Sequence, residues 1–134
     1  MVRVRMRIVE GGIMPVRRTE GAVCYDCFAR LPYGMTIPAG ARALVPLGFA
    51  AEVPRGLEIQ IRPLGSMSRA GVDVCLGTVG ADDRGECCAC VVNCQEEGLE
   101  IRDGDRICQV AVRSVPDVVL VEEVSAGTGA KECA

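Results

Sequence analysis

The chain has 134 residues, of which 49% are hydrophobic, and it carries a net charge of -3 with a pI of about 5.0. This length suits a single domain with one sizeable core, and the hydrophobic content excludes a disordered chain. The acidic balance argues against a surface for nucleic acid or an anionic membrane. No apolar run approaches the roughly 18 residues of a membrane helix. We therefore expect neither nucleic acid nor a membrane among the partners of the chain.

Histidine is absent from the sequence, and cysteine occurs nine times. Without histidine the chain cannot build Ser-His-Asp or Cys-His catalysis, nor a zinc site that needs a histidine ligand. The residues from Met1 to Val9 alternate between charged and apolar, unlike the continuous apolar stretch of a signal peptide. An odd number of cysteines without a targeting segment fits a reducing compartment. We expect the cytoplasm, or the host cytoplasm if the chain comes from a virus or phage.

Alternation with a period of two predicts strands along most of the sequence. In chain order, strands are expected at residues 2–9, 42–49, 57–62, 87–93, 107–112 and 118–124. Turn residues such as Pro54-Arg55-Gly56 and Asp103-Gly104-Asp105 recur about every 8–12 positions, a spacing typical of a sandwich or barrel. The only helix expected is a turn or two at residues 66–70. The predicted fold class is therefore all-β.

Four motifs stand in order between residues 14 and 109. They are Gly21–Ala29 around Tyr25-Asp26, Arg62–Met67, Gly77–Glu86 and Gly104–Gln109, with Ile37–Ala50 and Val53–Glu58 as further landmarks between the first two. In this order they resemble the trimeric dUTPase family. The resemblance implies a jelly-roll-like β-sandwich of the β-clip type, assembled as a homotrimer with sites at the subunit interfaces. It further implies Mg²⁺-dependent hydrolysis of dUTP to dUMP and pyrophosphate.

The resemblance also sets the domain boundaries that we expect. Residues 1–124 would form a single β domain. Residues 125–134 would form a flexible tail in the place of the family's C-terminal arm, which closes over the nucleotide. The arm's phenylalanine and arginine have no counterpart in this tail, where Gly127-Thr128-Gly129 is a remnant of its glycine-rich pattern.

Two motifs depart from the family at positions that touch the substrate. The aspartate that acts as general base in the third motif is Gly80 here, and the tyrosine that stacks under the deoxyribose is Asp83. In the second motif, the phosphate-binding arginine and serine are Leu64 and Gly65, with Ser66 retained after them. We therefore expect a dUTPase-like protein whose hydrolysis is impaired or lost. The alternative is a non-catalytic trimer that senses a nucleotide or binds a protein on the same scaffold.

The resemblance assigns roles to individual residues. Contacts to the nucleotide or its phosphates are expected from Ser66, Gly77, Arg84, Asp105 and Gln109. Asp82 and Asp83 are the candidate substitutes for the missing base, and the alternative is two solvated turn aspartates. Asp26 is the candidate to hold Mg²⁺ through water, with a nucleoside triphosphate as the main ligand.

Structural alternatives remain open for two of these candidates. Ser66 could instead cap the short helix that follows it. The segment from Asp105 to Gln109 could instead be a tight turn that enters a strand, with Arg106 paired to a carboxylate.

The cysteines have a spacing that could supply a Cys₄ zinc site, with Cys24 and Cys27 as one pair and a second set at residues 87–94. In a strand, however, Cys24 and Cys27 would point to opposite faces. Likewise, Cys88 and Cys90 would share one face and Cys87 would oppose them. Because cysteine packs as a small hydrophobic side chain, we expect these residues to fill the core rather than to bind zinc.

Overall fold

The computed structural model of the chain describes residues 1–124, which contain strands β1 to β11 and one short helix. The strands are β1 (Arg5–Ile8), β2 (Tyr25–Phe28), β3 (Met35–Ile37), β4 (Arg42–Pro46), β5 (Phe49–Glu52), β6 (Leu57–Arg62), β7 (Val72–Val74), β8 (Gly77–Val79), β9 (Cys88–Asn93), β10 (Leu99–Ile101) and β11 (Arg106–Ser114). Helix α1 (Gly65–Arg69) lies between β6 and β7. No helix in this part of the chain has the length and apolar character needed to cross a bilayer.

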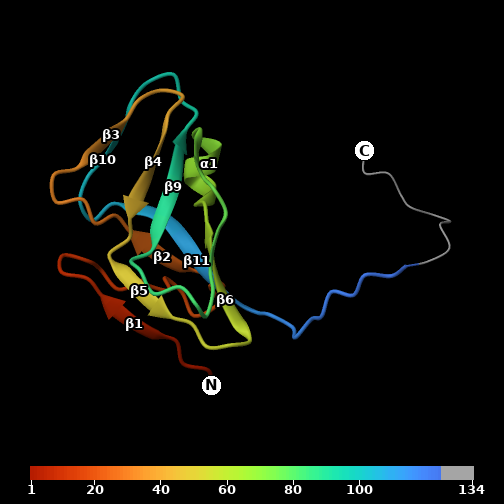
Figure 1. Cartoon of the computed structure of the whole chain (residues 1–134). Helices are drawn as coiled ribbons and strands as arrows, with labels where there is room; N and C mark the ends of the chain where they lie inside the picture. The colour runs from red at the N-terminus through yellow and green to blue at the C-terminus, as the bar shows by residue number, and fades with distance from the viewer. Residues whose placement is uncertain (125–134) are drawn as a thin grey trace.

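Within residues 1–124 all strand pairs are antiparallel, and they form four sheets. The largest has the order β2-β11-β6-β8, and a three-stranded sheet has the order β4-β9-β7. The pairs β1-β5 and β10-β3 form two smaller sheets. In Figure 1 the strands gather into one body, and residues 115–124 run away from it as an extended segment. The prediction of an all-β fold is confirmed.

The core is built from aliphatic and cysteine side chains that alternate inward along the strands. Phe49 is the largest side chain that is fully buried, and Ile37, Leu47, Ile59 and Ile101 pack in the same cluster. Cys27 and Cys108 are also fully buried there. Cysteine therefore fills part of a core in which aromatic residues are scarce.

Neighbouring cysteines differ in burial, as expected of side chains on opposite faces, but Cys24 and Cys87 precede β2 and β9 instead of lying in them. Cys27 is buried while Cys24 is half-buried, and Cys87 is buried while Cys88 and Cys90 on β9 are half-buried. Within residues 1–124, no group of three or more cysteine or acidic side chains is arranged to hold a metal ion.

The expected strand bounds agree best with the observed bounds where charged and apolar residues alternate most regularly. The strand expected at residues 57–62 is β6 with the same bounds, and those at 87–93 and 107–112 are β9 and the middle of β11. The first strand is shorter than residues 2–9, because only Arg5–Ile8 pair with β5. The helix expected at 66–70 is α1, which starts one residue earlier.

Two strand predictions are wrong. Residues 42–49 do not form one strand, because the chain turns between β4 and β5 at Gly48, whose φ of 76° favours glycine. A Cβ atom on Gly48 would also lie 2.6 Å from the Cα of Gly12. Residues 118–124 form no strand, although their sequence alternates as one would. A strand needs a neighbour for its backbone hydrogen bonds, and this segment is exposed along its length.

The carboxylate of Glu86, just before β9, pairs with Arg30 and also binds the turn at Gly48. Arg30 donates from Nε and from a terminal nitrogen to the two carboxylate oxygens of Glu86, each at 2.7 Å. The backbone N–H of Gly48 donates to the same carboxylate at 2.9 Å. These bonds from Arg30 and Gly48 hold the pKa of Glu86 below its ordinary value.

This ion pair predicts an acid-dependent loss of stability. Because the native pKa of Glu86 is depressed, its contribution is present above the ordinary carboxyl pKa of about 4.3 and is lost as the pH falls through the lower native value. The Glu86→Gln variant should therefore lose less free energy of unfolding than the wild type in this window. Urea unfolding at a series of pH values measures the difference, and exposed Glu96→Gln is the control. Parallel curves for the wild type and Glu86→Gln would contradict the prediction.

Candidate functional site

Two predicted site residues, Asp26 and Gln109, lie opposite each other on neighbouring strands of the four-stranded sheet. Gln109 in β11 lies opposite Asp26 in β2 and opposite Arg62 in β6. Beyond Arg62 the chain passes through Pro63 into α1, which carries Ser66. The side-chain amide of Gln109 donates to the carbonyl oxygen of Pro63 at 3.0 Å, so the strand and the entry to the helix are joined.

An open cavity of about 530 Å³ lies between these elements. It is lined by Arg18, Ala22, Val23, Cys24, Asp26, Leu64, Gly65, Ser66, Arg106 and Gln109. Three of the residues predicted from the sequence, Asp26, Ser66 and Gln109, therefore line one space although they come from distant parts of the chain. We call this space the Asp26 cavity.

The electrostatics of the cavity centre on Asp26, which is only 6% exposed. Its Oδ2 atom lies 3.2 Å from a terminal nitrogen of Arg106 and 3.7 Å from Nε of Arg18. The pairing of Arg106 with a carboxylate, which belongs to the structural alternative, is thus present, while a contact of this segment with phosphate stays a prediction. Two guanidinium groups against one carboxylate leave a surplus of positive charge at the cavity, which suits a phosphate group.

Arg18 is a site residue that sequence reasoning missed. It reaches the cavity because Val16 forms an isolated antiparallel bridge with Asp26, which lays residues 16–18 beside β2. The adjacent pair Arg17-Arg18, shortly before the first motif, is the only local signal that could have pointed to it.

By the resemblance, positions 64 and 65 in the second motif are where a phosphate-binding arginine and serine are expected, and both hold other residues here. Leu64, in the place of the arginine, is 5% exposed. A Cβ atom on Gly65 would meet only Nη1 of Arg69 at 3.6 Å, an ordinary contact, so the missing serine would fit. The N-cap of α1 is Leu64, and no side chain caps the helix. The alternative in which Ser66 caps the helix is therefore wrong, and its hydroxyl is not committed to the helix terminus.

The residues of the third motif do not line the Asp26 cavity. Gly77 opens β8 and pairs with Ile61 of β6. In the turn after β8, the backbone N–H of Gly80 donates to Oδ2 of Asp83 at 2.7 Å, and the N–H of Asp83 donates to the carbonyl of Gly80 at 3.2 Å. Arg84 donates to the carbonyl oxygens of Ala81 and Asp83 in the same turn.

These contacts define what the turn can do. The carboxylate of Asp83 closes the turn, and Asp82 is exposed. Neither residue lines the Asp26 cavity, nor do Gly77 and Arg84. Asp82 and Arg84 instead line a separate surface cavity of about 450 Å³ together with Arg3, Arg5 and Arg55 among others. Within one chain, the third motif is therefore apart from the other predicted residues.

Asp105 also stays outside the Asp26 cavity. Its carboxylate accepts a hydrogen bond from the backbone N–H of Arg102 at 2.8 Å, and so it closes the turn before β11. Its carbonyl oxygen accepts from the N–H of Ala29, which joins this turn to the end of β2. Both contacts hold the turn that leads into β11, the strand that carries Gln109.

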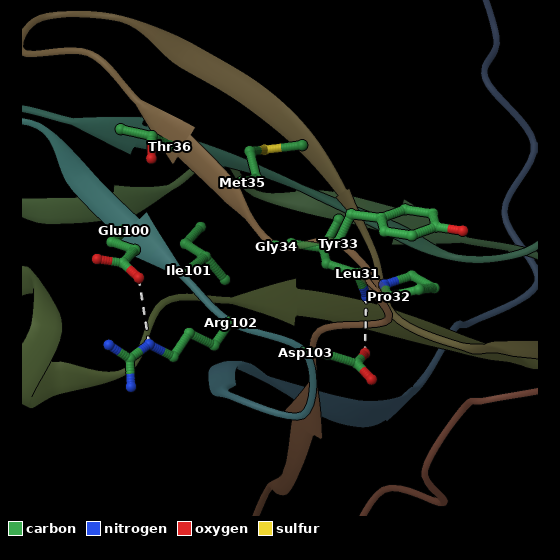
Figure 2. A pocket seen from close by; sticks show the side chains of 10 residues that line it. All are labelled: Leu31, Pro32, Tyr33, Gly34, Met35, Thr36, Glu100, Ile101, Arg102 and Asp103. Carbon is green, nitrogen blue, oxygen red and sulfur yellow. Dashed lines mark hydrogen bonds and ion pairs between the residues drawn. The ribbon is translucent and has the colours of Figure 1, made fainter.

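A third cavity, of about 520 Å³, lies beside the β3-β10 pair and is shown in Figure 2. Its polar groups bond to one another: Asp103 accepts from the N–H of Leu31 at 2.9 Å, and Arg102 pairs with Glu100 at 3.2 Å. None of the predicted site residues lies there. The Asp26 cavity is therefore the better candidate for a phosphate ligand.

A magnesium ion would fit this cavity only indirectly. Asp26 is its single carboxylate, and both arginines contact the Oδ2 atom of that side chain. One carboxylate cannot replace the six oxygen ligands that Mg²⁺ prefers. Asp26 could hold a metal-bound water, provided that a ligand such as a triphosphate supplied most of the oxygens.

The chain is similar to known proteins of one family. The dUTPase family model matches residues 10–130. The deoxyuridine 5'-triphosphate nucleotidohydrolase of Beijerinckia indica is 39% identical over 123 residues, which cover 88% of this chain and 77% of that protein. The enzyme of the same name from Caulobacter vibrioides is 38% identical over 114 residues, covering 81% and 74%.

Solved structures of phage dUTPases share the fold. The dUTPase of Staphylococcus bacteriophage 80alpha, solved with dUpNHpp, superposes with a TM-score of 0.82 at 17% identity and covers 98% of this chain and 96% of its own. A mutant dUTPase of phage phi11 of S. aureus, described with a structural Mg(II) ion, superposes with a TM-score of 0.79 at 17% identity and covers 92% and 99%. On its sequence and its fold, this chain belongs to the dUTPase family.

Proposed function

We propose that the chain binds dUTP and hydrolyses it to dUMP and pyrophosphate far more slowly than a dUTPase with an aspartate in the place of Gly80. The observation that carries this proposal is the turn after β8. Gly80 offers no side chain, and the nearest carboxylate, that of Asp83, accepts a hydrogen bond from the N–H of Gly80 at 2.7 Å. Loss of a general base typically costs about 10²–10⁴ in rate.

The Asp26 cavity supports binding of the phosphates. Arg18 and Arg106 supply positive charge, while Ser66 and Gln109 supply a hydroxyl and an amide on the cavity wall. A phosphate would compete with Asp26 for the guanidinium groups. Mg²⁺ would arrive with the triphosphate and neutralise part of its charge, and Asp26 would orient one of its waters.

We further propose a homotrimer with nucleotide sites between subunits. One chain holds the Asp26 cavity and the turn at Gly80–Asp83 apart, as expected when a neighbouring copy supplies the second part. The exposed residues Val118–Val121 offer apolar surface to such a neighbour. In this assembly residues 1–124 are the β domain, and the segment at 125–134, in the place of the family's arm, lies outside the described residues. The compartment we propose is the cytoplasm, that of the host if the chain is viral.

A non-catalytic nucleotide sensor is the second candidate function. The buried Leu64 in the place of the phosphate-binding arginine favours it, because the site has lost a charge-assisted contact as well as its base. The two candidates share the binding step and differ in turnover, so one set of measurements separates them.

The experiment combines calorimetric titration with dUpNHpp and pyrophosphate release from each deoxynucleoside triphosphate with Mg²⁺. We expect binding of the analogue and slow release from dUTP. Arg18→Gln should weaken binding about 10-fold or more, since charge-assisted hydrogen bonds contribute roughly 1.5–3 kcal/mol. Arg102→Gln, an exposed arginine outside the cavity, is the matched control.

Asp82→Ala should leave the slow release unchanged, because Asp82 is exposed and the carboxylate that closes the turn is that of Asp83. Release that disappears in Asp82→Ala would instead make Asp82 the substitute base. Binding with no detectable release from any triphosphate would favour the sensor. Absence of binding would overturn both candidates.

A further inference from the structure

Two cysteines that the nucleotide site does not use meet on the surface of the three-stranded sheet. In the ladder between β7 and β9, the last pair is Val74 opposite Val91, and the same register extended by one residue places Cys75 opposite Cys90. The backbone N–H of Cys75 donates to the carbonyl oxygen of Cys90 at 2.9 Å, so the ladder continues through this pair. Cys75 is exposed and Cys90 is half-buried.

The geometry of the pair suits a covalent bond between the sulfur atoms. Residues directly opposite each other in an antiparallel ladder have Cα atoms about 4.5–5.5 Å apart. Disulfides span Cα separations of about 4.4–6.8 Å, so the backbone need not move. Residues directly opposite each other in an antiparallel ladder carry their side chains on the same face of the sheet, so the two thiols are neighbours. Burial, followed by the neighbouring Cys75 thiol, raises the pKa of Cys90.

The core holds a second pair of opposed cysteines, which differs from the first in that both side chains are buried. Cys27 and Cys108 are partners in the β2-β11 ladder, and both side chains are fully buried. The hydrogen bond with Cys108, followed by burial, raises the pKa of the Cys27 thiol. A reagent in solvent reaches this pair only when the core opens, whereas Cys75 is open to attack in the folded chain.

We infer that Cys75 and Cys90 form a redox-active dithiol site, which small-molecule disulfides convert into a disulfide bond across the ladder. The Cys75 thiolate attacks one sulfur of the small disulfide, forming a mixed disulfide and releasing one small thiolate. Cys90 then loses its proton and attacks the sulfur of Cys75, which forms the Cys75–Cys90 bond and releases the second small thiolate. The chain loses two electrons and two protons, and the small disulfide becomes two thiols.

The bond would constrain a segment that matters for the nucleotide site. Cys75 and Leu76 connect β7 in one sheet to β8 in another. The closed loop, residues 75–90, contains the turn at Gly80–Asp83. Closing a loop reduces the freedom of the unfolded chain, so the oxidised protein should unfold at a higher temperature than the reduced protein.

Peptide mapping tests the inference on the whole chain. The reduced protein is incubated with excess oxidised glutathione, its remaining thiols are alkylated, and trypsin is added. Cleavage after Arg69, Arg84 and Arg102 separates Cys75, in residues 70–84, from Cys90, in residues 85–102. We expect these two peptides to be joined by a bond that dithiothreitol breaks, and the sulfur atom of Cys75 to retain no glutathione.

Variants identify the sulfur atoms. Cys75→Ser and Cys90→Ser should each abolish the linked peptide, whereas Cys88→Ser and Cys94→Ser should retain it. Because the wild type is compared with itself in two redox states, the main readout does not depend on the folding of a variant. Glutathione that remains on Cys75, a linkage that survives in Cys90→Ser, or no linkage at any glutathione concentration would overturn the inference.

Discussion

Restoring the two substituted residues of the third motif is expected to raise pyrophosphate release from dUTP by about 10²–10⁴-fold. The double variant Gly80→Asp with Asp83→Tyr returns a carboxylate to the position of the family's general base. The backbone accepts the change, since the φ angle of Gly80 is not in the left-handed region. A Cβ atom there would meet only Oδ2 of Asp83, at 3.7 Å, which is an ordinary contact.

Both substitutions are needed because Gly80 and Asp83 touch. With Gly80→Asp alone, a second carboxylate would stand beside that of Asp83, and two like charges at this distance raise the pKa of one of them. A proton shared between the two would weaken the base. We therefore expect the single variant to gain less than the double variant, in which a tyrosine replaces the competing carboxylate.

A coupled assay for pyrophosphate with dUTP and Mg²⁺ measures the gain. Gly85→Asp with Asp83→Tyr is the matched control, because a Cβ atom on Gly85 meets nothing within 4 Å and the added charge is the same. Equal rates in the two double variants would show that position 80 is not where a base acts. An unchanged rate with intact binding of dUpNHpp would place the defect in the second motif, at Leu64 and Gly65.

The sequence predicted the fold best where local pattern and tertiary environment agree. Leu57–Arg62 alternates cleanly because it pairs on both sides, with β11 and with β8, and packs its alternate residues into the core. The break at Gly48 could not be predicted from alternation. It depends on the close approach of Gly12, which is 36 residues away in the chain.

Part of the candidate site could be predicted because its residues stand in motifs that are recognisable in the sequence. Asp26, Ser66 and Gln109 stand in ordered motifs, and the sheet brings all three to one cavity. Arg18 joins them through a single bridge at Val16, which leaves no periodic signal in the sequence. The Cys75–Cys90 pair depends on the register between β7 and β9, so the spacing of cysteines along the chain could not reveal it.

The largest loss of stability is expected from Asn93→Asp, a substitution that barely changes the shape of the side chain. Asn93 is fully buried at the end of β9. Its Nδ2 atom donates to the carbonyl oxygens of Ile37 at 3.0 Å, Pro38 at 3.3 Å and Glu97 at 2.9 Å, and its Oδ1 atom accepts from the N–H of Gln95 at 3.0 Å. This one amide joins β3, β9 and the loop that leads to β10.

An aspartate at this position would turn a charged oxygen toward three carbonyl oxygens. Buried groups left unpaired cost about 1–3 kcal/mol each, and an uncompensated buried charge costs about 3–5 kcal/mol. We expect Asn93→Asp to lower the free energy of unfolding at pH 7 by at least about 3 kcal/mol, measured by urea unfolding. Gln95→Glu adds the same charge two residues later at a half-buried position, and it should cost about 1 kcal/mol or less.

The pH dependence distinguishes this cause from simple loss of packing. Burial among carbonyl groups would raise the pKa of the new carboxyl in the folded state above its unfolded value of about 3.9. The folded state then binds the proton more tightly, so the stability of Asn93→Asp relative to the wild type should recover as the pH falls from 7 toward that value. A neutral carboxyl can also donate to one of the three carbonyl oxygens. If the loss of unfolding free energy in Asn93→Asp instead stays constant over this pH range, the charge of the new carboxylate is not its cause.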